Sequence, residues 1–258
     1  TPTVISSGIT VTFSAAPRSI LAGSISITDA ALGTPELFAT NVNGEDSAAI
    51  TTNIGPTLTN NALLIDIVGK PRGNNTYTPG AGQIERWDNE LAGNGNGATG
   101  AMSTKQVSAV SDSMTQTHSN ATRRNAQAVV SIAPVNSSST ATFDAVASAS
   151  VSNNTTLNWT HTFSTATTFN TKLVVGVTYR VDAACGGISV SSVTFGNLTM
   201  SQIAATSVFD GTRCQYSELW YVDLNDIIVS TNNNSTLGGQ AIDQDEAVEY
   251  NVISDTGT

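Results

Sequence analysis

The sequence is poor in charge, and above all in basic side chains. Charged residues make up 12% of its 258 residues, and 20 Asp and Glu against 10 Lys and Arg give a formal net charge of −10. Binding to the phosphates of nucleic acid or to an anionic membrane surface requires clustered Lys and Arg. The one basic pair, Arg123-Arg124, stands alone, so we expect no nucleic-acid partner.

Long apolar runs are also missing. No segment approaches the roughly 20 apolar residues of a membrane-spanning helix, so we expect no membrane span. The chain opens on Thr1-Pro2-Thr3, as a mature exported protein does once its signal peptide is removed, and its end carries no lipid-attachment motif. These features predict a secreted protein, extracellular or on the cell surface.

Cysteine and histidine occur only twice each. In an exported chain, Cys185 and Cys214 predict one disulfide, with two free buried thiols as the alternative. Two cysteines without paired histidines do not make a zinc site. His161 alternates with Trp159 and is expected to be packed or at the surface, whereas His118 lies in a Ser/Thr/Asn stretch and is expected to be exposed.

Catalytic and cofactor motifs are absent or incomplete. No Gly-x-Ser-x-Gly elbow accompanies the histidines. Asp88 and Glu90 follow Trp87, which invites comparison with a sugar site, but a core tryptophan beside a solvated turn is the favoured interpretation. The glycines of 95–100 match a dinucleotide-binding spacing, without the strand and helix that such a site requires. We therefore expect neither an enzyme nor a bound cofactor.

What the chain does contain is apolar and β-branched residues at a period of two, which is typical of strands. About ten strands and no persuasive helix predict an all-β fold, a jelly-roll or immunoglobulin-like β-sandwich, in a single domain over residues 1–258. A helical turn is conceivable over 102–116. The expected strands are 9–13, 20–27, 62–68, 127–132, 156–163, 172–180, 188–195, 198–205, 215–223 and 227–231.

Surface chemistry suggests two further kinds of site. Asn-x-Ser/Thr sequons in expected loops make Asn74, Asn136 and Asn233 the preferred glycosylation sites, if the source glycosylates. An acidic tail over 237–258 contains Asp243, Asp245 and Glu246, but it lacks the glycine and final glutamate of an EF-hand loop. Calcium binding is left open, and a solvated tail is the simpler interpretation.

Several segments resemble a β-domain that is common in bacterial and phage surface proteins, often repeated in tandem and largely uncharacterised. The resemblance rests on 172–177 (Lys-Leu-Val-Val-Gly-Val), 190–202 and Glu218-Leu219-Trp220-Tyr221-Val222, with a second block over 9–134. It covers most of residues 9–230. Because its motifs are structural, it implies a fold and an extracellular setting and no catalytic residue.

The order of the two blocks is reversed relative to that domain, as in a circular permutation. Some strand must then fill the position that follows 218–222: the chain's own N-terminal strand, its own 227–231, or the N-terminal strand of another copy. The last choice is donor-strand exchange, in which Ile9, Val11 and Phe13 of residues 1–13 would be the donor residues. Exchange that does not close produces filaments.

The leading functional prediction is a structural subunit of an extracellular filament or surface assembly, a pilus-like homopolymer whose partners are other copies of itself. The first alternative is an adhesin or carbohydrate-binding module with a glycan ligand. A phage or virion decoration protein is the second. A binding module should stay monomeric and display a row of surface aromatics, whereas a filament subunit should bury residues 4–13 in another chain.

Overall fold

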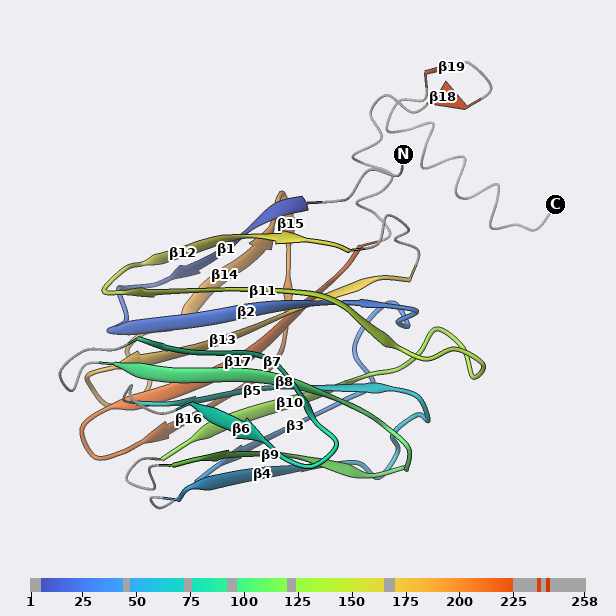
Figure 1. The fold of residues 1–258 in the computed structure, drawn as a ribbon. Helices are drawn as coiled ribbons and strands as arrows, with labels where there is room; N and C mark the ends of the chain where they lie inside the picture. Colours follow the sequence, from blue (N-terminus) through green and yellow to red (C-terminus); the bar gives the residue numbers. More distant parts are fainter. Residues whose placement is uncertain are drawn as a thin grey trace.

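The fold is all-β, as the sequence predicted. The computed structural model describes residues 6–43, 47–71, 76–91, 97–119, 124–164 and 170–224, and the backbone of 236–237 and 240–241. Within these ranges it contains no helix, and every paired strand runs antiparallel to its neighbours. Figure 1 shows the strands stacked in layers from top to bottom.

Four sheets carry almost all of the strands. Sheet 1 has the order β12 (Thr156–Thr162), β1 (Ser6–Phe13), β14 (Val190–Phe195), β15 (Leu198–Thr199). Sheet 2 has the order β11 (Thr142–Ser152), β2 (Ser19–Thr28), β13 (Lys172–Val181), β17 (Cys214–Asp223), β16 (Ser201–Phe209). Sheet 3 has the order β3 (Leu37–Val42), β10 (Ala126–Ile132), β5 (Leu63–Lys70), β8 (Ala98–Gln106), β7 (Ile84–Leu91). Sheet 4 has the order β4 (Ala49–Ile54), β9 (Asp112–His118), β6 (Tyr77–Pro79). A separate pair, β18 (Thr236–Leu237) and β19 (Gln240–Ala241), lies at the start of the acidic tail.

The sheets stack in that order, each buried face meeting the next. Sheets 1 and 2 share a core that includes Val11 and Val175, and sheets 2 and 3 share one that includes Ile27 and Ile65. Two smaller apolar clusters join sheet 3 to sheet 4. The expected sandwich is therefore the central part of a four-layered stack (Figure 1).

The two inner sheets are covered on both faces. All residues of β5, β10 and β13 are buried, and strands of that kind have apolar residues in succession instead of in alternation. This is why the runs at 62–68 and 172–180 stood out in the sequence. The outer strands β3 and β11 alternate or stay half exposed.

The sequence prediction missed the polar strands and misplaced one boundary. Strands β3, β4, β6, β7, β8, β9 and β11 were not expected. Residues 102–116 hold parts of β8 and β9, so the suggested helical turn is wrong. The expected strand 198–205 is divided between two sheets, because β15 pairs with β14 in sheet 1 while β16 pairs with β17 in sheet 2. Residues 227–231 lie outside the described residues.

Candidate functional site

Strand β1, which carries the predicted donor residues, lies in the interior of sheet 1. It pairs with β12 from Ser6 to Thr12 and with β14 on its other side. Ile9 and Val11 are fully buried and Phe13 is 4% exposed. The ring of Phe13 meets Tyr179 of sheet 2 edge-on, with 5.0 Å between centroids. In this single chain, β1 therefore fills its own fold.

A short connection, residues 14–18, joins β1 to β2. It is held at both ends: the Ser14 amide donates to the carbonyl of Ser189 at 3.0 Å, and the Arg18 amide donates to the carbonyl of Arg180 at 2.9 Å. The Arg18 guanidinium also donates to Asn153 Oδ1 at 3.2 Å. This connection is the covalent link between β1 and the rest of the stack.

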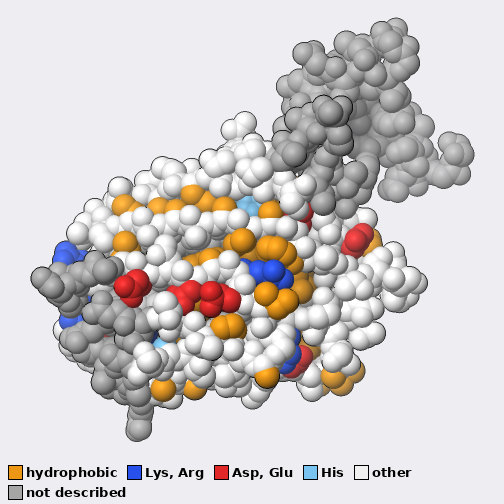
Figure 2. Space-filling model, in the orientation of Figure 1, with side chains coloured by type: hydrophobic (Ala, Val, Ile, Leu, Met, Phe, Trp, Pro, Cys, Tyr) orange, Lys and Arg blue, Asp and Glu red, His pale blue; other side chains and the backbone are white. Residues whose placement is uncertain are grey.

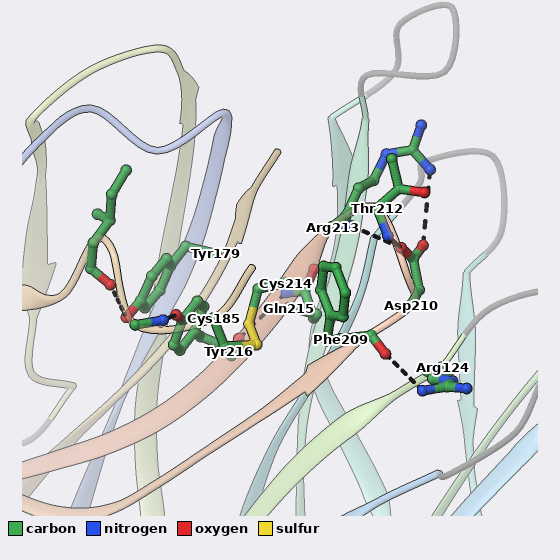
Figure 3. Close-up of a disulfide and its surroundings, with 12 residues drawn as sticks. Arg124, Tyr179, Cys185, Phe209, Asp210, Thr212, Arg213, Cys214, Gln215 and Tyr216 are labelled. Carbon is green, nitrogen blue, oxygen red and sulfur yellow. Dashed lines mark hydrogen bonds and ion pairs between the residues drawn. A yellow bond between two sulfur atoms is a disulfide. The ribbon is translucent and has the colours of Figure 1, made fainter. Parts of the chain in front are cut away.

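The disulfide predicted from the sequence is present. Cys185 and Cys214 are joined across 29 residues, with 5.1 Å between their Cα atoms. Figure 3 shows the bond beside Tyr179 and Tyr216, whose rings stack 4.4 Å apart. The Gly186 amide donates to the Tyr216 hydroxyl at 2.6 Å. The bond thus ties the segment after β13 to the first residue of β17.

His161 is packed, as one of the two predicted options had it. Its side chain is fully buried between sheets 1 and 2, with Nδ1 2.8 Å from Ser24 Oγ and Nε2 3.0 Å from Ser26 Oγ. Ser26 donates to Asp144, and Trp159 Nε1 donates to Ser24 Oγ. Burial lowers the pKa of His161 to about 4. These buried hydrogen bonds tie β12 of sheet 1 to β2 of sheet 2.

His118 is not exposed, so that expectation is wrong. It ends β9 with 5% of its surface exposed, because sheet 4 turns this position toward sheet 3. Its Nδ1 lies 3.2 Å from Lys70 Nζ, and its ring meets Tyr77 edge-on at 5.4 Å. Its surroundings in the stack, and not the polar character of the nearby sequence, decide its burial.

Trp87 is a core residue, as favoured over the sugar platform, but Asp88 and Glu90 lie in strand β7 and not in a solvated turn. Trp87 is 7% exposed and packs in the core between sheets 2 and 3. Asp88, on the opposite face of β7, accepts a hydrogen bond from the Tyr77 amide at 2.5 Å. Burial raises the pKa of Asp88 to about 6. The tryptophan and the acid point to different layers, so they do not form one site.

Of the three predicted glycosylation sites, one lies among the described residues. Asn136 lies in an exposed turn, where its Oδ1 accepts hydrogen bonds from the Ser138 amide at 2.9 Å and from Ser139 Oγ at 3.0 Å. Asn74 and Asn233 lie outside the described residues, as do Asp243, Asp245 and Glu246 of the tail. Among the residues that are described, no cluster of His, Cys, Asp and Glu is arranged to hold a metal ion.

One polar cluster was not anticipated from the sequence. Lys70, Tyr77, His118 and Asn125 are all at most 5% exposed and lie between sheets 3 and 4. The Tyr77 hydroxyl donates to Asn125 Oδ1 at 2.6 Å. The signal in the sequence was Lys70, which follows the apolar segment 62–68. A lysine at the end of a strand is ordinarily solvated, so this signal did not predict burial.

The face of the molecule drawn in Figure 2 carries few charged side chains. Figure 2 shows one face on which acidic, basic and apolar side chains form small islands among other residues. No helix in the described part of the chain is long and apolar enough to cross a membrane. No known protein family, curated protein or solved structure matches the chain.

Proposed function

We propose that this protein is a structural subunit of an extracellular filament or surface assembly, in which β1 of one copy fills sheet 1 of the next. The observation that carries the proposal is the position of β1. It is bonded on both sides, between β12 and β14, yet a single connection links it to β2. Such a strand can be supplied by another copy without breaking any other link in the fold.

The free energy of burying β1 between β12 and β14 is favourable whether the strand comes from the same chain or from another copy. Burying each large apolar side chain of β1 contributes roughly 1.5–3 kcal/mol, and Ile9, Val11 and Phe13 are all buried. Without β1, the facing edges of β12 and β14 would lose their backbone partners. Unpaired edges recruit strands from other chains. The same contacts form whether the strand comes from its own chain or from another copy.

The connection 14–18 sets the reach of an exchanged strand. Fully extended, five residues span at most about 17 Å, so neighbouring copies would be held close. Exchange would release the bonds that Ser14 and Arg18 make with their own chain. The disulfide and the weakly charged surface support an extracellular setting, because disulfides persist in oxidising compartments.

A cysteine pair placed across β1 and β12 tests the proposal. Thr10 pairs with Asn158 in the register, at a separation that suits a disulfide. In the variant Thr10→Cys/Asn158→Cys, exchanged strands would give a ladder of linked chains on a non-reducing gel. The single variant Thr10→Cys is the control. A double variant that is fully oxidised and entirely monomeric would contradict the exchange.

Electron microscopy supplies the second readout. Filaments should form from the full chain and should be absent when residues 1–13 are removed. A peptide of residues 6–14 should bind to the shortened chain, and the resulting complex should be a folded monomer. Removing residues 242–258 is the matched control and should leave filaments intact. Folded monomers from every version would redirect the function to the adhesin or glycan-binding alternative.

A further inference from the structure

The buried cluster between sheets 3 and 4 brings together a lysine amine and an asparagine amide. Gly69 of β5 pairs with Ala126 of β10, so Lys70 and Asn125 occupy the next positions on these antiparallel strands. The carbonyl oxygen of Asn125 accepts a hydrogen bond from Asn43 on its other side. The backbone carbonyl of Asn125 thus points away from β5. Lys70 and Asn125 are therefore a non-hydrogen-bonded pair, the kind in which side chains approach most closely.

Both side chains are shielded from water. Lys70 is 2% exposed and Asn125 is fully buried. No ion pair is formed by Lys70 within the described residues, although Asp88 and Glu90 act on it through space. A buried ammonium without a bonded carboxylate is costly, and loss of its charge removes that cost. Burial lowers the pKa of Lys70 to about 8, so a substantial share of the amine is neutral and nucleophilic in mild alkali.

The neighbours supply the groups that an amide exchange requires. The Tyr77 hydroxyl donates to Asn125 Oδ1 at 2.6 Å and polarises the carbonyl in the manner of an oxyanion donor. His118 Nδ1, 3.2 Å from Lys70 Nζ, is placed to take a proton from the amine. Asp88 Oδ1 is buried and has no hydrogen-bond partner among the described residues, so this carboxylate is able to accept the proton that Nζ loses and pass it to the departing nitrogen.

We propose that Lys70 and Asn125 react to form an intramolecular isopeptide bond that links β5 to the start of β10. Neutral Nζ attacks Cγ of Asn125, the Nζ–Cγ bond forms and the Cγ–Nδ2 bond breaks. Nζ loses one proton and the departing nitrogen gains one, so that ammonia leaves. No electrons are transferred and no co-reactant is required.

The reaction requires a movement of the Lys70 side chain. Nζ must swing from His118 Nδ1 to Cγ of Asn125, which the flexible stem of lysine allows. Tyr77 is near both groups, with its ring centroid 5.8 Å from Nζ and its hydroxyl bonded to the amide oxygen of Asn125. The cross-link lies within one chain, so it is independent of whether copies assemble through β1.

Intact mass spectrometry of the full chain tests the bond. After reduction of the disulfide, the denatured protein should be lighter than its sequence mass by one ammonia. Trypsin should leave the segment that ends at Arg72 joined to the segment that begins at Asn125. This map is needed because cyclisation at an Asn-Gly sequence such as Asn96-Gly97 also releases ammonia.

Variants assign the bond to its residues. Lys70→Arg and Asn125→Ala should each have the full sequence mass, and Tyr77→Phe should slow the mass loss roughly 100-fold. Lys172→Arg is the matched control, since Lys172 is equally buried but bonded to Asp223, and it should keep the loss. A wild-type chain that holds its full mass after prolonged incubation at mildly alkaline pH would overturn the proposal, as would a wild-type mass loss in which the tryptic map leaves the two segments separate.

Discussion

The indole ring of Trp87 lies directly against the α-carbon of Gly23. A Cβ added to Gly23 would fall 1.8 Å from Trp87 Nε1 and 2.3 Å from Cε2. Gly23 is at the middle of β2, and Trp87 comes from β7 in the next layer. The absence of one side chain in sheet 2 thus makes room for the largest side chain of sheet 3.

We expect Gly23→Ala to destabilise the fold by about 1–3 kcal/mol, because overpacking a filled core forces side chains out of their rotamers. Urea unfolding followed by tryptophan fluorescence measures the change. Gly8→Ala is the matched control: it also lies in a strand, but nothing is within 4 Å of its added Cβ, so it should be neutral or slightly stabilising. Equal stabilities for the two variants would refute this packing argument.

Removing the disulfide should cost about 3–4 kcal/mol, as expected when a loop of some 30 residues is released in the unfolded chain. The variant to measure is Cys185→Ser/Cys214→Ser, compared with the wild type with and without a reducing agent. The double variant should not respond to reduction. An unchanged melting temperature would mean that the bond adds nothing to a segment already held by Tyr216.

His161 should make the fold less stable in acid. Its pKa is lowered to about 4 by burial, whereas an unfolded histidine titrates near 6.5. The unfolded chain binds a proton first, so this contribution to stability is fully present above pH 6.5 and is lost as the pH falls toward 4. The wild type should therefore lose more stability between pH 7 and pH 4 than His161→Gln does.

Asp88 changes the stability with pH in the opposite direction over the same range. The test of His161 therefore compares the pH–stability curves of the wild type and the variant. The pKa of Asp88 is raised to about 6, so its contribution is present below the unfolded value near 3.9 and is lost as the pH rises through 6. Asp88→Asn should remove this loss of stability with rising pH. If His161→Gln and the wild type had parallel stability curves, the assignment to His161 would fail.

Asp66 should be among the most sensitive polar positions. It is fully buried, and its carboxylate accepts hydrogen bonds from Ser103, Gln116 and Gln127 at 2.7–2.9 Å. Asp66→Ala would remove the acceptor of the Ser103 amide and of Gln127 Nε2, and it would leave Gln116 Nε2 only its 3.0 Å bond to Ser103 Oγ. We expect a cost of about 3 kcal/mol or more. Thr51→Ala, which breaks only the exposed hydroxyl contact with Thr115, should change stability by less than about 0.5 kcal/mol.

The strands of the apolar segments, the disulfide between the two cysteines and the core position of Trp87 were predictable from the amino-acid sequence. These follow from local chemistry: β-branched residues favour strands, and two cysteines have a single pairing. The buried runs at 62–68 and 172–180 were legible because strands covered on both faces are apolar throughout.

The four-layer stack and the burial of polar residues depend on contacts between segments that are far apart in the chain. Strands such as β4 and β9 are rich in Thr, Ser and Asn, and they become strands because sheet 3 offers them a face. His118, Lys70 and Asn125 are buried for the same reason, since a polar side chain is buried when distant residues supply its hydrogen bonds. That supply depends on contacts between layers, and no local pattern in the chain records it.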